Sequence, residues 1–309
     1  MNKIIAIVGP TGVGKTKLSI ELAKEFNGEI ISCDSMQFYK GLDIGTAKVT
    51  KEEMQGIKHH LIDIIEVREQ FSVAEYQNIV RSKINELLKK NITPILVGGS
   101  GLFINSVLYD YRFKGVKRDE STLEKYDAMK LDDLVELLKK TAPNVADNTD
   151  LNNRRRVLRA LEKTDSDVDL SGKKLFYKNA IIIGLEMDRA LLYKNIELRI
   201  DKMVDNGLLQ EAEWLYNQNL DTQATKAIGY KEFFGYFDKK NNLEFSKDLL
   251  KRNSRRYAKR QMTWFKNKMD CNWYFVGDKS FNETIKEITE NIKEKKDWFA
   301  STYKYFSLF

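Results

Sequence analysis

The sequence contains few cysteines and few prolines. Its 309 residues include two cysteines, Cys33 and Cys271, and three prolines. Two cysteines cannot form a disulfide framework or a cysteine-rich zinc site, and they suit a reducing compartment. We therefore expect a cytoplasmic protein whose stability comes from a hydrophobic core, for which a 42% hydrophobic content is sufficient.

Long apolar runs and histidine clusters are also missing. No run approaches the roughly 20 apolar residues that a membrane-spanning helix needs. The N-terminal KIIAIVG is broken by Gly9 and Pro10 too early for a signal peptide. His59 and His60 are adjacent, and no cysteine or acidic cluster lies near them, so they make a poor metal site. We expect no membrane attachment, and we expect the two histidines to have a structural or RNA-adjacent role.

Positive charge exceeds negative charge, with 52 basic and 45 acidic residues and a net charge of +7. Residues 251–268, KRNSRRYAKRQMTWFKNK, hold eight basic residues and no acid. On a helix, five of them share one face: Arg252, Arg255, Arg256, Lys259 and Arg260. An adjacent apolar stripe would pack on the core: Ala258, Met262, Phe265 and Met269. This pattern is typical of a surface that binds a nucleic-acid backbone, whereas a merely solvated helix face usually mixes both signs of charge.

The stretch GPTGVGKT, residues 9–16, has the pattern of a phosphate-binding loop. It follows an apolar run at 4–8 that predicts a buried parallel strand, and it precedes the amphipathic KLSIELAKEF. Its backbone N–H groups and the helix N-terminus would attract anionic oxygens. Lys15 would reach the phosphates and Thr16 would offer its hydroxyl to Mg²⁺. The alternative is a glycine-rich turn that holds no ligand.

Further strand-like runs alternate with helical patterns along most of the chain. They are EIISC (29–33), HLIDII (60–65), TPILVGG (93–99), NAIIIGL (179–185) and NWYFVG (272–277). Ser280 and Glu283 form a capping box before a C-terminal helix. This alternation predicts an α/β fold, a P-loop core with a doubly wound, mostly parallel sheet.

Residues 113–178 contain no strand-like run. The stretches TLEKYDAMKLDDLVELLKK and NNRRRVLRALEK in this segment are helical in pattern and highly charged. We therefore expect a helical insertion at 113–178 within an α/β core that is formed by 1–112 and 179–309.

Asp34 ends the second predicted strand and begins DSMQFYKGLDIGTAK. This position is on the edge where open α/β sheets bind ligands, so Asp34 could ligate Mg²⁺ or act as a general base. The alternative is a carboxylate that caps the next turn. Asp63, after a hydrophobic run, could hold Mg²⁺ as in a kinase.

Three functional classes remain open on these features. The phosphate loop alone would favour a small-molecule kinase or NTPase. The basic helix favours an enzyme that acts on a nucleic acid with a diphosphate-bearing co-substrate. A non-catalytic RNA-binding module is the third class, but simple RNA binding requires no diphosphate site.

The chain resembles the bacterial tRNA dimethylallyltransferases, or tRNA isopentenyltransferases. The resemblance runs from about residue 9 to 266, in the family's order, through GPTGVGKT, DSMQFYKGLDIGTAK, HHLIDI, FSVAEY, LVGGSGLFI, RALE, KAIGYKE and RYAKRQMTWFK. It implies that the loop holds the diphosphate of dimethylallyl diphosphate, with Mg²⁺. It also implies transfer of the five-carbon group to N6 of the adenine just 3′ of the anticodon, in tRNAs reading codons that begin with U.

The resemblance also implies roles for individual residues. Asp34 would be the general base, Arg199 would stabilise the leaving group, and Ser100 would replace a family threonine that faces the reaction centre. The diphosphate would bind to Gly9, Pro10, Thr11, Gly12, Val13, Gly14, Lys15 and Thr16, with Thr16 also a metal ligand. The tRNA would contact Asp34, Ser35, Met36, Gln37, Ser100, Arg155, Arg156, Arg159, Ala227, Gly229, Tyr230, Lys231, Arg256, Lys259, Arg260, Gln261 and Trp264.

The implied partner is the anticodon stem-loop of tRNA, gripped between the core and the insertion. The target adenine would have to leave its stack to reach the site. No obligate protein partner is expected. The sequence departs from the family pattern at Asn195, where an arginine is frequent, at Phe103, where the family has tyrosine, and at DLNN (150–153), where it has H-P-N-D.

Overall fold

The computed structural model describes residues 3–111, 113, 126, 128–164 and 174–306; at 155, 162–164 and 295–306 it describes the backbone alone. The chain divides into two compact units, Met1–Asp110 with Lys173–Phe309 and Tyr111–Gly172. The start of the predicted helical stretch TLEKYDAMK lies largely outside the described residues.

The larger unit contains a six-stranded sheet in the order β3-β2-β4-β1-β5-β6. All its strand pairs are parallel, which confirms the predicted α/β fold and makes the sheet more regular than the sequence indicated. Ile5 of the central strand is in register with Ile95 on one side and Ile181 on the other. The strands are β1 (Ile4–Val8), β2 (Gly28–Ser32), β3 (His59–His60), β4 (Thr93–Val97), β5 (Ala180–Met187) and β6 (Asn272–Val276).

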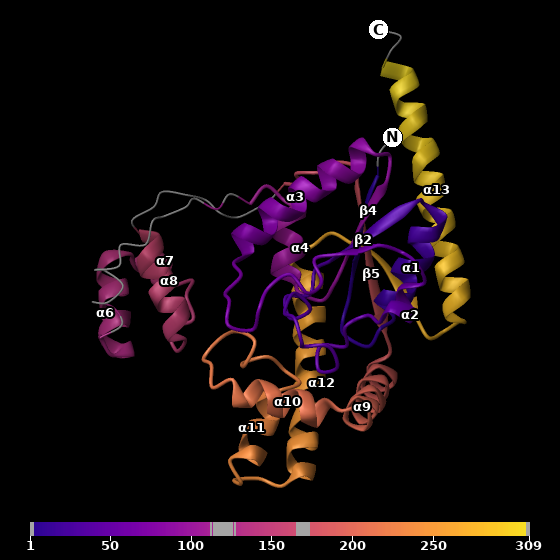
Figure 1. The fold of residues 1–309 in the computed structure, drawn as a ribbon. Helices are drawn as coiled ribbons and strands as arrows, with labels where there is room; N and C mark the ends of the chain where they lie inside the picture. Colours follow the sequence, from indigo (N-terminus) through magenta and orange to yellow (C-terminus); the bar gives the residue numbers. More distant parts are fainter. Residues whose placement is uncertain (1–2, 112, 114–125, 127, 165–173, 307–309) are drawn as a thin grey trace. The chain divides into compact units, whose positions relative to one another are not determined.

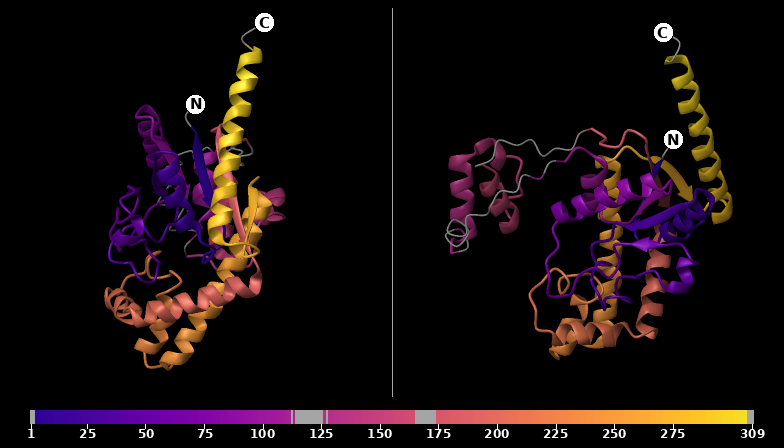
Figure 2. Two further views of the ribbon diagram at one scale, coloured as in Figure 1. Left: turned by 90° about the vertical axis from the view of Figure 1, so that its right-hand side faces the viewer. Right: turned by 45° about the horizontal axis from the view of Figure 1, so that its top comes forward.

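Helices cover both faces of this sheet (Figures 1 and 2). On one face lie α1 (Lys15–Glu25) and α13 (Phe281–Phe306), and on the other lie α3 (Val73–Lys89) and α4 (Gly101–Leu108). Because β1 is covered on both faces, all five of its residues are buried, as an uninterrupted apolar run predicts. The remaining helices of this unit are α2 (Lys51–Met54), α9 (Arg189–Asp205), α10 (Leu208–Asn217), α11 (Lys231–Phe237) and α12 (Leu243–Lys268).

The predicted capping box at the start of α13 is confirmed. The backbone N–H of Ser280 donates to Glu283 Oε2 over 2.8 Å, and the backbone N–H of Glu283 donates to Ser280 Oγ over 3.3 Å. Ile288 and Ile292 of this helix are buried, as their helical spacing predicts. The reciprocal bonds therefore fix where the last helix begins.

The prediction of a strand over 60–65 is wrong for most of its length. The strand β3 contains only His59 and His60, because Leu61 and Asp63 have positive φ values of 61° and 55°. Asp63 forms an ion pair of 2.6 Å with Lys48. The segment therefore turns away from the sheet directly after its histidines.

The smaller unit is helical over its described residues. It contains α6 (Leu131–Thr141), α7 (Pro143–Ala146) and α8 (Arg154–Thr164). These helices enclose a small core of their own: Leu134, Leu138, Ala146, Val157, Ala160 and Leu161. The Arg154 guanidinium donates to the carbonyls of Met129 (2.5 Å) and Tyr126 (2.9 Å), which ties α8 to the segment before α6.

Residues 174–178, which the sequence placed in the insertion, lie along the core. The backbone N–H of Lys174 donates to the Asp110 carboxylate over 3.1 Å, and Leu175 forms an antiparallel bridge with Tyr109. The boundary between the units therefore falls a few residues earlier in the chain than 178. Within the described part of the chain, no helix has the length and apolar character needed to cross a bilayer.

Candidate active site

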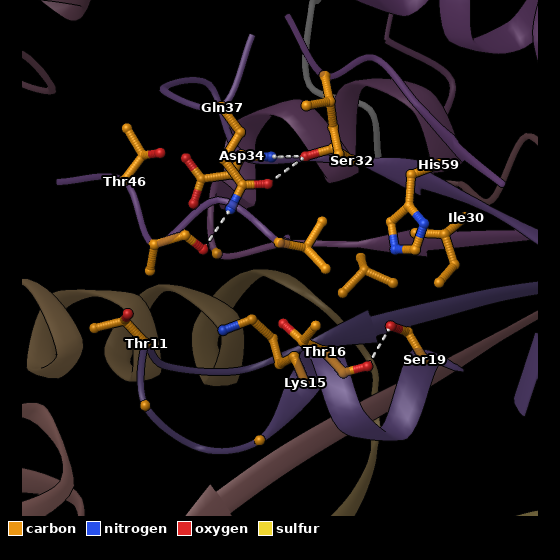
Figure 3. A pocket seen from close by; sticks show the side chains of 18 of the residues that line it. Thr11, Lys15, Thr16, Ser19, Ile30, Ser32, Asp34, Gln37, Thr46 and His59 are labelled. Atoms are coloured by element: carbon orange, nitrogen blue, oxygen red, sulfur yellow. Dashed lines mark hydrogen bonds between the residues drawn. The ribbon is translucent and has the colours of Figure 1, made fainter. Parts of the chain in front are cut away.

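Parallel strands bring three loops to one edge of the sheet. The phosphate loop follows β1, Asp34 follows β2, and Gly98–Gly99 follow β4. Together they line a cavity of about 230 Å³. Figure 3 shows Thr11, Lys15 and Thr16 on one wall of this cavity, with Asp34, Gln37 and Thr46 opposite.

The phosphate loop has the conformation that its glycines permit. Gly9 and Gly14 have φ values of 144° and 102°, and a Cβ at Gly9 would lie 2.6 Å from the Leu185 carbonyl oxygen. The Lys15 ammonium donates to the carbonyls of Gly9 (2.9 Å) and Pro10 (2.8 Å). Burial lowers the Lys15 pKa to about 7, although the Asp34 carboxylate opposes this shift. A bound anion would raise the Lys15 pKa again and so favour the charged form of this lysine.

Arg199 reaches the same cavity from α9. Its Nη2 donates to Thr11 Oγ1 over 2.6 Å. Its Nε is buried and has no hydrogen-bond partner among the described residues. Burial lowers the pKa of this guanidinium and Asp34 raises it. A buried N–H without a partner beside a cavity is a position where an acceptor, such as a phosphate oxygen, would be stabilised.

Asp34 is half-buried on the opposite wall. Its Oδ1 accepts the backbone N–H of Met36 over 3.1 Å. Burial raises the Asp34 pKa, while that hydrogen bond and the charges of Lys15 and Arg199 lower it. A carboxylate whose pKa is raised toward neutrality is a better general base than an ordinary aspartate.

Ser100 lies next to this wall, although it is not among the residues that line the cavity. Its Oγ accepts the backbone N–H of Ser35 over 3.3 Å and lies 3.4 Å from Ser35 Oγ. Tyr257 of α12 belongs to the same neighbourhood: burial and then Asp34 raise its pKa to about 12, while Ser100 and Gln261 lower it. The sequence prediction missed Tyr257, because it assigned its neighbours to the basic face, the apolar stripe or tRNA contact and gave Tyr257 no role.

Glu211 was also missed, and it organises one wall of the cavity. Its carboxylate accepts the backbone N–H groups of Asp43, Ile44 and Gly45, each over 2.9 Å, and the Tyr230 hydroxyl over 2.6 Å. The loop it holds continues into Thr46, Ala47 and Val49, which line the cavity. Nothing in the local sequence could identify Glu211, because its three backbone partners lie 166 to 168 residues away in the chain.

Apolar side chains also line the cavity: Ile30, Val49, Ile62 and Val97, together with His59. The His59 Nδ1 lies 2.9 Å from the Ile57 carbonyl oxygen, and burial lowers the His59 pKa. His60 instead contacts Glu29 over 2.5 Å. Asp63, considered above as a metal ligand, does not line the cavity.

The residues predicted to contact tRNA differ in exposure. Four are buried: Ala227, Gly229, Tyr230 and Gln261. Others are half-buried: Ser35, Met36, Gln37 and Trp264. Those with exposed side chains are Arg156, Arg159, Lys231, Arg256, Lys259 and Arg260. The side chain of Arg155 lies outside the described part of the structure.

The basic face of α12 is only partly neutralised. Arg255 is paired with Glu197, and Lys251 and Lys266 are paired with Asp201 and Glu186. By contrast, the other four members of the five-residue basic face are exposed and form no ion pair within the described residues: Arg252, Arg256, Lys259 and Arg260. The apolar side of the helix is buried through Ala258 and Phe265, as predicted. The helix therefore presents unneutralised positive charge to solvent.

Residues 37–268 match the family model described as IPP transferase. The chain belongs to the IPP transferase family. Two similar proteins are the tRNA dimethylallyltransferase of Anoxybacillus flavithermus (strain DSM 21510 / WK1), 48% identical over 95% of this chain and 97% of that protein, and the one of Bacillus anthracis, 49% identical over 95% and 96%.

Solved structures of IPP transferase relatives have the same fold. The tRNA isopentenylpyrophosphate transferase of Bacillus halodurans is 45% identical, with a TM-score of 0.77 over 98% of this chain and 100% of that one. A eukaryotic dimethylallyltransferase acting on tRNA is 29% identical, with a TM-score of 0.84 over 97% of this chain and 80% of that one. The resemblance inferred from the motifs is confirmed at the level of the family.

Proposed function

We propose that this chain transfers the dimethylallyl group of dimethylallyl diphosphate to N6 of the adenine just 3′ of the anticodon in tRNA. The observation that carries the proposal is one cavity that holds a phosphate loop, the buried Arg199 guanidinium and the Asp34 carboxylate. Family membership supports the same activity, because the relatives are named for it.

The residues of the cavity suit each part of this reaction. The C1–O bond of the donor breaks, and positive charge at the allylic C1 is stabilised by delocalisation. Lys15 and Arg199 neutralise the negative charge that develops on the departing diphosphate. The N6 nitrogen forms the new bond to C1 and loses a proton, for which Asp34 is the acceptor. The raised pKa of Asp34 suits that role.

The oxygen ligands that line the cavity also suit Mg²⁺. Thr16 and Asp34 line the same cavity and provide one hydroxyl and one carboxylate. Mg²⁺ usually keeps several waters and takes its other ligands from one or two carboxylates and from substrate phosphates. The described residues contain no group of three or more His, Cys, Asp or Glu side chains, so a cage made wholly of protein does not fit. We propose that Thr16 holds Mg²⁺, which would neutralise charge on the leaving diphosphate.

We propose that tRNA binds through the exposed cations of α12 and of the insertion. Arg256, Lys259 and Arg260 are exposed on α12, and Arg159 is exposed on α8. Arg156 is also exposed, and it contacts Asp150 over 3.3 Å. Cations at such positions neutralise backbone phosphates and displace counterions, which makes binding weaken steeply with salt.

The proposal is tested by tRNA from cells that lack this gene. Digestion to nucleosides and mass spectrometry should show that N6-isopentenyladenosine is lost and that it returns with the wild-type gene. If prenylated adenosine persists, the proposed function is wrong. In that case, turnover of ATP by the purified chain would favour a kinase or NTPase.

A further inference from the structure

Gln261 of α12 connects two of the loops that form the cavity. Its side chain is only 5% exposed. Its Oε1 accepts the backbone N–H of Thr11 over 2.9 Å, and its Nε2 donates to the Gly99 carbonyl oxygen over 3.0 Å. Thr11 belongs to the loop after β1 and Gly99 to the loop after β4, so one amide spans both. Both loop residues line the cavity, whereas Gln261 does not.

Gly99 provides the space that this amide occupies. A Cβ at Gly99 would lie 2.0 Å from Gln261 Nε2 and 3.2 Å from its Cδ, and the three nearest atoms all belong to Gln261. Gly99 has no positive φ, so its backbone does not require glycine. The absence of a side chain at Gly99 is therefore explained by the position of the Gln261 amide.

Thr11 is held from two directions. Its backbone N–H is bonded to Gln261, and its hydroxyl accepts from Arg199 Nη2 over 2.6 Å. The loop segment that faces the diphosphate is thus fixed by α12 on one side and by α9 on the other. On α12, the residue next to Gln261 is Arg260, which is exposed on the basic face.

We propose that Gln261 is a positioning residue, which sets the phosphate loop against the β4 loop and makes diphosphate affinity depend on α12. This inference rests on the proposed function. It revises the expectation that Gln261 contacts tRNA directly, because both of its polar atoms are already bonded within the protein. The reason is physical: a loop whose N–H groups must converge on an anion loses affinity when its backbone is free to shift.

The test compares the full chain with single and double variants. Gln261→Met keeps the length of the side chain and removes both hydrogen bonds. Gly99→Ala leaves α12 unchanged and displaces the amide. Ser246→Ala is the matched control, because Ser246 is buried on α12 and its hydroxyl has no hydrogen-bond partner among the described residues. Calorimetry with inorganic pyrophosphate and with dimethylallyl diphosphate, and filter binding of an anticodon stem-loop RNA, give the two affinities.

We expect Gln261→Met and Gly99→Ala to weaken binding of both diphosphates about tenfold, as loss of a supporting hydrogen-bond shell typically does. RNA affinity should stay within about twofold, and Ser246→Ala should match the wild type. The double variant Gly99→Ala with Gln261→Ala should bind the diphosphates as tightly as Gln261→Ala alone. Without the Gln261 amide, the new methyl group at position 99 no longer collides with it. This comparison does not use the Gly99→Ala single variant, so it remains available if that variant proves unstable.

The outcomes separate this inference from the proposed function. If the wild-type chain binds neither diphosphate, the proposed function fails. If it binds them and Gln261→Met binds them equally well, the positioning role is wrong. A loss of RNA affinity with unchanged diphosphate affinity would also overturn it, and would return Gln261 to the direct RNA contacts.

Discussion

Arg199 Nη2 donates to Thr11 Oγ1 over 2.6 Å, so residues 188 positions apart in the chain meet at the phosphate loop. The same guanidinium has a buried Nε without a partner among the described residues. We expect Arg199→Lys to lower the single-turnover rate of prenyl transfer by roughly 100-fold. A lysine ammonium cannot donate to Thr11 Oγ1 and also replace the buried Nε–H donor of the arginine. RNA affinity should not change. Rapid-quench measurement with a stem-loop RNA tests this, and a rate within threefold of the wild type would contradict it.

The lowered pKa of Lys15 predicts that kcat/KM for dimethylallyl diphosphate depends on pH. Its pKa is lowered to about 7, so the lysine is charged below pH 7 and loses its charge as the pH rises through that value. The kcat/KM for dimethylallyl diphosphate should therefore fall above pH 7. At lower pH it should rise with pH as Asp34, whose pKa is raised, becomes ionised.

The variant Lys15→Arg separates this effect from general instability at high pH. Arginine stays charged, so its profile should lack the decline above pH 7 even though the absolute rate is lower. Profiles of kcat/KM between pH 5 and 9 check both chains. If the decline persists unchanged in Lys15→Arg, Lys15 is not its cause.

The hydrogen bonds of Glu211 predict an effect on protein stability. Its carboxylate accepts three backbone N–H groups and the Tyr230 hydroxyl. We expect Glu211→Ala to lower the free energy of unfolding by about 1–3 kcal/mol, because these donors lose a charged acceptor. Urea denaturation measures the change. Glu213→Ala is the control, since Glu213 is exposed on the same helix; equal effects of the two variants would count against the role given to Glu211.

The exposed cations of α12 predict that each one adds to the salt dependence of RNA binding. Arg256→Gln and Lys259→Gln should each weaken stem-loop binding and reduce the slope of log K against log[salt] by about 1. Arg255→Gln should have a smaller effect, because Arg255 is already paired with Glu197. Filter binding across a range of salt concentrations gives the slopes. A larger effect at Arg255 than at Arg256 would show that the exposed cations are not the RNA surface.

The sequence predicted those parts of the fold that depend on local pattern. The run at 4–8, the glycines of the phosphate loop and the Ser280–Glu283 box each act within a few residues, and each has the predicted structure. Asp34 and Lys15 could be assigned to one site because parallel strands end at a common edge. The strand over 60–65 failed because hydrophobicity does not reveal the positive φ of Leu61 and Asp63.

The supporting residues of the site could not be predicted from the sequence. Glu211 and Gln261 act on backbone groups that are distant along the chain, and no local pattern marks a carboxylate or an amide for such a partner. The exposure of individual side chains could not be predicted either, because it depends on contacts with distant parts of the chain. Tyr230 lies in a motif associated with tRNA contact, yet it is fully buried against Glu211.

The central claim is that the phosphate loop holds an allylic diphosphate while Asp34 accepts a proton from adenine N6. The most direct measurement is mass spectrometry of an unmodified anticodon stem-loop RNA incubated with the wild-type chain, or with Asp34→Asn, together with dimethylallyl diphosphate and Mg²⁺ but no ATP. We expect one five-carbon group on the adenine next to the anticodon with the wild type. Asp34→Asn should react at least about 100-fold more slowly while it still binds pyrophosphate. No transfer by the wild type, or transfer by Asp34→Asn at the wild-type rate, would contradict the claim.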